Sequence, residues 1–196
     1  FFFFLMIGDH RDLHSFPTRR SSDLTDLALV LTGKENIQPE QMQWGFTRKY
    51  QDWLLINARV ETILEKPIFR DSVRHCRCVI PAAGFYEWNK DKEKVTFTMP
   101  ESKNLYMAGI WQPTENHSQF TILTTAPNKS MRPVHDRMPL VLKPEEIIPW
   151  IQDWDSAEKL LYKTPPLLEH KQEYKQLSIF TNSVIHTLNY QTIKMP

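Results

Sequence analysis

Cysteine and glycine are scarce in this sequence, which has two cysteines and five glycines among 196 residues. The cysteines, Cys76 and Cys78, would share one face of a strand, where a disulfide between them would be strained. We therefore expect no disulfide scaffold and a reducing, cytoplasmic location. So few glycines leave no phosphate-cradling loop, and neither a dinucleotide-binding fingerprint nor a nucleophile elbow is present.

Long apolar runs and a strong net charge are also absent. The apolar residues 1–7 are too few to cross a membrane, so we expect no transmembrane segment. The formal net charge is +1 at pH 7, so a nucleic acid would have to be held by a local basic patch. His75 beside the cysteines could suggest a metal, but no second ligand cluster follows at zinc-type spacing, and we expect no metal.

What remains is typical of one globular domain, with 41% apolar and 24% charged residues. Residues 1–24 differ from the rest, because they show neither a helical nor a strand period. They resemble translated adapter read-through joined to a truncated gene, with a natural disordered leader as the alternative. We expect residues 1–24 to be non-native and not folded, and residues 25–196 to form the domain, truncated at its amino terminus.

Short β-branched or aromatic segments between polar turns predict an α+β fold with a mostly antiparallel, barrel-like β-core and a few flanking helices. The expected strands are residues 77–80, 95–99, 105–111, 120–125 and 140–142. Residues 27–31 could form a strand or a helix, and residues 177–189 are β-like. A helix is expected within residues 63–73, with its regular part beginning at Pro67, and a later helix is expected to be capped by Asp155.

Residues 78–88 are the stretch on which the functional interpretation depends most. They place Glu87 between Tyr86 and Trp88. In a partly dry pocket the charged form of this carboxyl is disfavoured, so its pKa rises toward a range useful for general acid catalysis. The alternative is an ordinary alternating strand with Phe85 inward, Tyr86 outward and Glu87 at the surface or hydrogen-bonded to a turn.

Three other polar segments could carry chemistry. Asn57 and Arg59 would share a face of an extended segment, where they could bind a polar group and a phosphate, or could be a turn Asn and a surface Arg. Thr124 and Thr125 at a strand end could line a site or satisfy a turn. His135, in a loop with Asp and Arg, is an acid–base candidate. A phosphohydrolase metal site would need further ligands that the sequence does not show.

Taken together, these segments resemble the SRAP (SOS response-associated peptidase) family over roughly residues 40–185. The resemblance is carried by residues 44–45, 56–62, 77–88, 108–111, 120–128 and 135–139. Any one of these motifs would be weak evidence, whereas the whole set in the family's order is specific.

The resemblance implies a protein that finds abasic sites in single-stranded DNA and bends the strand in a positively charged channel. In the family, a cysteine at position 2 supplies an α-amine and a thiol that attack the ring-opened sugar and give a thiazolidine cross-link. By the same resemblance, Glu87 would transfer protons during Schiff-base formation and His135 would assist ring opening and reversal. Asn57 would hold the reacting groups in place.

The resemblance also implies which residues contact DNA. Arg59 and Arg137 would hold phosphates, and Trp44 would stack on or wedge against a base. Arg77 and Thr125 complete the expected set. The implied partner is single-stranded DNA with abasic sites, bound by a monomer that associates with the nucleoid; no cofactor and no membrane partner are expected.

The sequence departs from the family pattern at position 2, which is Phe2. Neither cysteine carries a free α-amine, so we expect the chain as written not to form the thiazolidine. A missing first strand would also leave backbone groups unpaired along its neighbour. Two other interpretations stay open: a non-catalytic single-stranded DNA-binding module, and a peptidase that processes its own leader through Glu87 and His135.

Overall fold

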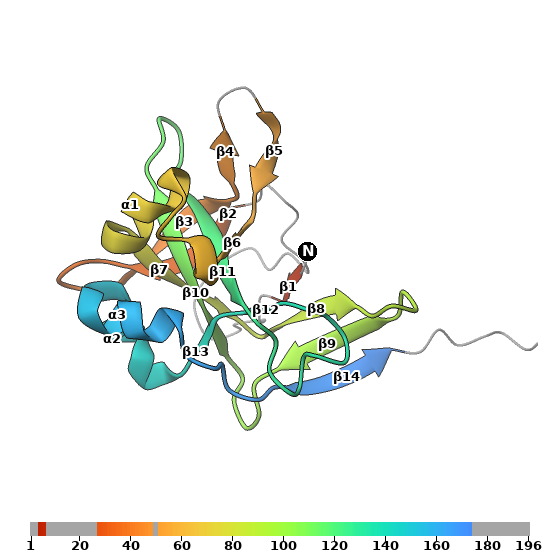
Figure 1. Cartoon of the computed structure of the whole chain (residues 1–196). Helices are drawn as coiled ribbons and strands as arrows, with labels where there is room; N and C mark the ends of the chain where they lie inside the picture. Colours follow the sequence, from red (N-terminus) through yellow and green to blue (C-terminus); the bar gives the residue numbers. More distant parts are fainter. Residues whose placement is uncertain (1–3, 7–26, 49–50, 174–196) are drawn as a thin grey trace, which may run out of the picture.

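The computed structural model describes residues 4–6, 27–48 and 51–173, and its fold is α+β (Figure 1). Strands dominate this part of the chain, and helices α1, α2 and α3 lie together on one side of them. The expected α+β class with a strand-rich core is confirmed. The predicted β-like tail at residues 177–189 lies outside the described residues.

The larger sheet forms the barrel-like centre of the molecule. Its strands are β2 (Leu27–Thr32), β3 (Gln38–Trp44), β6 (Asn57–Arg59), β7 (Arg77–Ala82), β10 (Leu105–Gln112), β11 (Gln119–Thr125), β12 (Met138–Pro139) and β13 (Val141–Leu142). The pairings run from β2 to β7, β10, β11 and β3 and then return to β2, so these strands form a ring. The pairings are antiparallel except for those of β11 with β3 and β6, so the sheet is mostly antiparallel as expected.

The ring is unevenly joined. Strands β2 and β3 pair through six register positions, from Leu27 with Gln43 to Thr32 with Gln38. By contrast, β2 meets β7 at the single pair of Leu31 with Val79, and β3 meets β11 at two pairs. The β2–β3 hairpin is therefore bonded more extensively within itself than to its neighbours.

A smaller sheet lies on the side of the molecule opposite the helices (Figure 1). Its order is β1 (Phe4–Met6), β8 (Gly84–Trp88), β9 (Lys94–Thr98) and β14 (Glu169–Glu173). A separate hairpin consists of β4 (Phe46–Arg48) and β5 (Gln51–Leu55). Strand β8 matters most for function, because it carries Glu87.

Strand β1 changes one expectation about the leader. Residues 1–24 were expected not to fold, but Phe4–Met6 pairs antiparallel with β8, with Leu5 opposite Phe85. An edge strand offers unpaired backbone groups, and a short extended segment can satisfy them with little demand on its sequence. These three residues therefore form a strand in the structure, and the expectation for residues 1–24 as a whole stays a prediction.

The helical elements follow local signals, with one correction. They are η1 (Val60–Thr62), α1 (Pro67–His75), η2 (Pro144–Glu146), α2 (Ile147–Gln152) and α3 (Trp154–Leu161). Pro67 begins α1 as predicted, because proline suits the first turn of a helix. Helix α3 is capped not by Asp155 but by Asp153, whose carboxylate accepts the N–H of Ser156 at 2.9 Å. Asp153 has the extended backbone of a cap because α2 ends just before it.

Alternating strand residues divide the core into two layers. On β7, Cys78 and Ile80 pack with Phe85 and Phe97 of the smaller sheet, whereas Val79 packs toward the helices, in the layer that contains Trp150 of α2. This is the period of two expected for a strand buried on both faces. Within the described ranges, no helix has the length and apolar character needed to span a membrane.

Candidate functional site

Glu87 is a carboxyl inside the smaller sheet. Its strand β8 lies between β1 and β9, and Glu87 stands opposite Val95. Only 3% of the residue is exposed, and its buried Oε1 has no hydrogen-bond partner in the described part of the chain. Burial raises the pKa of Glu87 to about 8, although the backbone N–H of Trp88 counteracts part of the shift. The expected rise in pKa is confirmed, and the interpretation of Glu87 as a surface residue is wrong.

The cause of this burial differs from the one that the sequence suggested. On a strand, Tyr86 and Trp88 face away from Glu87, and their rings contact each other edge-to-face at 5.4 Å between centroids. Glu87 shares its face with Phe85, which is fully buried and stacks on Phe97 at 5.1 Å. The carboxyl is therefore kept dry by this inner face and not by the aromatic residues next to it in sequence.

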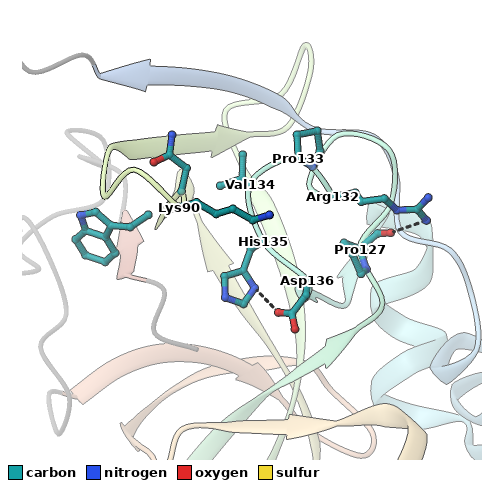
Figure 2. A pocket seen from close by; sticks show the side chains of 9 residues that line it. Lys90, Pro127, Arg132, Pro133, Val134, His135 and Asp136 are labelled. Carbon is teal, nitrogen blue, oxygen red and sulfur yellow. Dashed lines mark hydrogen bonds and ion pairs between the residues drawn. The ribbon is translucent and has the colours of Figure 1, made fainter.

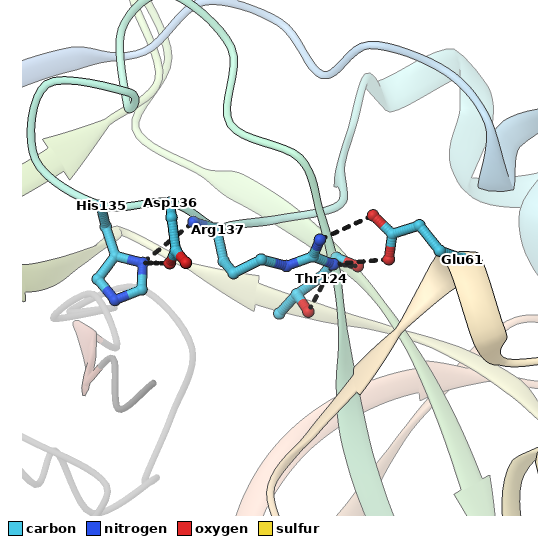
Figure 3. A network of polar contacts seen from close by, with 5 residues as sticks. All are labelled: Glu61, Thr124, His135, Asp136 and Arg137. Atoms are coloured by element: carbon cyan, nitrogen blue, oxygen red, sulfur yellow. Dashed lines mark hydrogen bonds and ion pairs between the residues drawn. The ribbon is translucent and has the colours of Figure 1, made fainter.

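His135 lies in the loop that follows β11. The backbone N–H of Arg137 donates to its Nδ1 at 3.0 Å, and Asp136 Oδ1 lies 2.9 Å from the same atom (Figure 3). The N–H of Arg137 favours the neutral ring with its proton on Nε2, whereas the carboxylate favours a proton on Nδ1. Burial has the larger effect and lowers the pKa of His135, with Asp136 acting in the opposite direction. The imidazole is therefore a base that is mainly neutral at pH 7.

Arg137 links this loop to η1. Its guanidinium forms a bidentate pair with Glu61, with Nη1–Oε1 at 2.7 Å and Nη2–Oε2 at 2.9 Å (Figure 3). Nη2 also donates to the carbonyl of Thr124 at 2.7 Å. The hydrogen bond from Arg137 holds the pKa of Glu61 below its usual value, and the charges of Arg137 and Arg59 lower it further. Arg137 thus fixes the loop to the end of β11, with its charge balanced by Glu61.

A cavity of about 700 Å³ opens beside His135. Figure 2 shows its lining from two regions of the chain, the end of β8 with the turn after it and the loop around His135. The lining residues are Trp88, Asn89, Lys90, Pro127, Arg132, Pro133, Val134, His135 and Asp136. We call this space the His135 cavity. Trp88, the last residue of β8, lines this cavity beside the imidazole, whereas Glu87 does not; Lys90 and Arg132 are its cations, and Asp136 is its carboxylate.

The other predicted residues have different positions. Asn57 is half-buried on β6 opposite Ile122 of β11, and Arg59 is exposed two positions further on, opposite Thr124. Thr125 is buried at the end of β11 and lines a second cavity, described below. The structure therefore brings Arg59, Arg137 and the end of β11 together, whereas Asn57 does not line the His135 cavity.

Trp44 corrects one predicted DNA contact. The residue is 1% exposed, its indole N–H donates to the carbonyl of Ile56 at 3.0 Å, and its ring lies parallel to that of Phe120 at 6.3 Å. A base cannot stack on a ring that the core already encloses. Trp44 is a core residue, because its strand β3 is part of the ring of strands.

Arg77 corrects a second predicted DNA contact. It is 5% exposed, and its guanidinium donates to four backbone carbonyls, those of Val73, Arg74, Trp150 and Ile151. These carbonyls lie at or near the ends of α1 and α2, where helices leave carbonyls without internal partners. Arg77 therefore joins two helix ends to β7 and has no surface for a phosphate.

The two cysteines are both free thiols. Cys78 is fully buried and Cys76 is partly buried, and desolvation raises the pKa of each thiol. A raised pKa leaves less of the thiolate that acts as nucleophile. Among the described residues, no three His, Cys, Asp or Glu side chains gather as a metal site requires.

Glu61 is the residue of this site whose role sequence reasoning missed. It is 76 positions from Arg137, and the parallel pairing of β6 with β11 brings the two together. A weak indication of this role was present in the sequence, because Glu61 lies two positions after Arg59 and belongs to a family motif. Asn128 was likewise treated only as part of a motif, although its side chain organises the loop before His135.

Before any comparison is made, the described residues define a class of site: a β-core domain with a buried carboxyl on β8 and an imidazole in a cavity that the end of β8 helps to line. Over residues 12–183 the sequence matches the family described as SOS response associated peptidase (SRAP), and the chain belongs to this family. The match begins at residue 12, inside the segment expected to be non-native. That expectation remains a prediction for the residues outside the described ranges.

Similar proteins agree with this assignment. The chain is 37% identical over 185 residues to the abasic site processing protein YobE of Bacillus subtilis, an alignment that covers 85% of this chain and 83% of YobE. It is 32% identical over 143 residues to the abasic site processing protein YedK of Escherichia coli, covering 69% and 64% of the two chains. The resemblance to the SRAP family is thus confirmed.

Solved structures support the fold. A protein from Bordetella bronchiseptica superimposes with a TM-score of 0.75 at 17% identity, over 88% of this chain and 99% of that one. A protein from Bacteroides thetaiotaomicron gives a TM-score of 0.64 at 24% identity, over 76% and 74% of the two chains. At these identities the likeness concerns the fold alone.

Proposed function

We propose that this chain binds abasic sites in single-stranded DNA, and that Glu87, as proton donor, and His135, as proton acceptor, serve a covalent reaction whose amine and thiol come from the family's amino-terminal cysteine. YobE and YedK are named abasic site processing proteins, which supports the same substrate for this chain. The observation that carries the proposal is the opposite displacement of two pKa values, that of Glu87 upward and that of His135 downward.

One physical cause acts on both groups. Burial disfavours charge, so it favours the protonated carboxyl and the unprotonated imidazole. With the pKa of Glu87 at about 8 and that of His135 below 6.5, each group is mainly neutral at pH 7. An acid that still holds its proton and a base with a free site to accept one are what a proton-transfer site requires.

These forms fit the chemistry of an abasic sugar. When the closed sugar opens to its aldehyde, the hydroxyl proton at the anomeric carbon must be removed, and neutral His135 can accept it. When an amine then adds to the aldehyde, the former carbonyl oxygen must gain protons before it leaves as water, and protonated Glu87 can supply one. The family chemistry ends when a thiol adds to the carbon–nitrogen double bond and closes the thiazolidine.

We assign the contacts with the DNA phosphates to exposed cations near the site. Arg59, Lys90 and Arg132 are exposed and can contact phosphates. Arg137 contributes less than its motif suggested, because Glu61 already balances its charge. We assign Arg137 the role of fixing the His135 loop.

The test is a denaturing-gel assay with a single-stranded oligonucleotide that contains one abasic site. The chain as printed is compared with a version in which residues 1–24 are replaced by a Met-Cys-Gly-Arg start and the family's first strand. We expect a covalent product with the second version alone. Its rate should rise as His135 loses its proton below pH 6.5 and should fall as Glu87 loses its proton near pH 8.

Two outcomes would contradict the proposal in different ways. A covalent product with the printed chain would mean that an internal lysine or cysteine reacts, and C76S and C78S variants would identify a cysteine. If both versions fold and bind DNA but neither gives a product, the roles of Asn57, Glu87 and His135 must be abandoned.

A DNA-binding module without catalysis is the second candidate, and the cysteines favour it. The thiols of Cys76 and Cys78 are buried or partly buried and have raised pKa values, so neither is suited to attack a sugar. This candidate predicts salt-dependent binding of intact and abasic strands with equal affinity and no covalent product.

A further inference from the structure

A second cavity adjoins the His135 cavity. It measures about 690 Å³ and shares Pro127 and Arg132 with the first. Its lining comes from the loop after β11 and from the segment after α3. The lining residues are Thr125, Ala126, Pro127, Asn128, Lys129, Arg132, Tyr162, Lys163, Thr164, Pro165, Pro166 and Leu167. We call it the flanking cavity.

We propose that the flanking cavity binds nucleotides next to the abasic site, with Tyr162 stacking on a base and Lys129 and Arg132 contacting phosphates. The inference rests on the proposed function, because the lesion is assigned to the His135 cavity. It adds a second subsite, whose occupant is an undamaged nucleotide of the same strand.

The charge of the flanking cavity favours a polyanion. Its lining contains three cations and no carboxylate. Lys163 is paired with Glu146, whereas Lys129 and Arg132 are exposed and form no ion pair among the described residues. Arg132 lies at the boundary of the two cavities, with Nη2 3.5 Å from the carbonyl of Pro127. A strand that passes from one cavity to the other would bring a phosphate to this guanidinium.

Tyr162 gives the cavity an aromatic surface. Its backbone closes the end of α3, where its N–H donates to the carbonyl of Lys159 at 3.2 Å. The residue is nevertheless 68% exposed, so its ring contributes little to the core. An exposed aromatic ring beside cations is the usual platform for a base of a single strand, since every base has a face that can stack.

The walls of the flanking cavity are held together before any ligand binds. The side-chain amide of Asn128 donates to the carbonyls of Pro165 and Pro166 at 3.1 and 2.8 Å, and its oxygen accepts the N–H of Ser130 at 2.9 Å. The hydroxyl of Ser130 in turn accepts the N–H of Leu168 at 3.1 Å. These bonds join the two segments that form the cavity, so little ordering is needed when a nucleotide enters.

The inference is tested by fluorescence anisotropy with the full chain and three labelled strands that each contain one abasic site. The short strand has one nucleotide on each side of the lesion, and the two long strands extend it by six nucleotides on the 5′ or the 3′ side. One long strand should bind more tightly than the short one. Y162A should lower the affinity for that long strand by about 5- to 100-fold and leave the affinity for the short strand unchanged. Y162F should bind all three strands like the unmodified chain.

The cations are tested by salt dependence. K129Q should lower the slope of log K against log salt for the long strand by about 0.7, the value for one phosphate on a single strand. K103Q is the matched control, because Lys103 is also exposed but lines neither cavity.

The possible failures are distinguishable. If a long strand binds tightly and Y162A and K129Q leave it unchanged, the flanking subsite is rejected and the proposed function stands. If the unmodified, folded chain binds none of the three strands, the proposed function is rejected and the subsite with it.

Discussion

Two glutamates of this protein show opposite solutions to the same problem. Glu61 is partly exposed and forms two hydrogen bonds with Arg137, which lowers its pKa and keeps it charged. Glu87 is buried, and among the described residues no donor reaches its Oε1; burial raises its pKa to about 8 and favours its neutral form. The comparison teaches that the side-chain type decides neither charge nor role, because the partner and the access of water decide both.

The largest expected effect concerns catalysis by Glu87. In the version with the Met-Cys-Gly-Arg start, E87Q should slow formation of the covalent product by about 100- to 10,000-fold, because the amide keeps the shape but cannot donate an acidic proton. Initial rates from the denaturing gel measure this loss, with equal DNA affinity as the control. A rate within threefold of the parent would show that Glu87 is not the proton donor.

The second effect concerns the pH dependence of stability. The folded state holds the proton of Glu87 more tightly than the unfolded state, so this stabilisation is complete below pH 4.5 and is lost as pH rises through about 8. Between pH 6.5 and 8 the free energy of unfolding should fall by roughly 2 kcal/mol, since one pKa unit corresponds to about 1.4 kcal/mol.

E87Q should lack this decline when urea unfolding is measured over the same interval. His135 does not cause this decline. Because its pKa is lowered in the folded state, its contribution to the free energy of unfolding is present above pH 6.5 and is lost only as pH falls through its folded pKa. An equal decline in E87Q and the parent would mean that Glu87 titrates normally.

The third effect concerns Glu61, whose partner Arg137 can be removed. R137M should lower the free energy of unfolding by about 1–2 kcal/mol, because the carbonyl of Thr124 loses its donor while the more exposed Glu61 can turn to water. The pKa of Glu61 should rise toward its ordinary value, which carbon-13 NMR of the carboxyl can follow. An unchanged pKa would mean that Arg137 is not its partner in solution.

The smallest effect isolates the pair itself. A double-mutant cycle with E61Q and R137M should give a coupling of about 0.5–1 kcal/mol, near the upper end for exposed ion pairs because two parallel hydrogen bonds are formed. R59Q combined with E61Q serves as the control, because Arg59 acts on Glu61 only through its charge. A coupling as small as that of the control would reduce Glu61 to a surface residue.

Local signals in the sequence predicted several features correctly. Pro67 marked the start of α1, and the β-branched and aromatic segments located the main strands. The direction of the pKa shift of Glu87 was also predicted, although its sequence neighbours were given the wrong role. A strand alternates its side chains, so the residues that dry a carboxyl are two positions away or on another strand.

Features that depend on distant parts of the chain were not predictable. Trp44 and Arg77 are residue types that often bind DNA. The ring of strands nevertheless encloses Trp44, and two helix ends enclose Arg77. Arg137 meets Glu61 only because β6 and β11 pair. A residue type shows what a side chain can bind, whereas tertiary structure determines whether DNA can reach it.

The unequal joints of the strand ring have a consequence for motion. Because β2 and β3 share six register pairs but meet β7 at one and β11 at two, the hairpin can separate from the barrel as a unit while its internal bonds persist. Hydrogen exchange should therefore be fastest along the seam at Leu31 and Val79 and slower between the two hairpin strands. The β2–β7 joint is the weaker of the two joints that hold the hairpin, and local opening of the core should begin there.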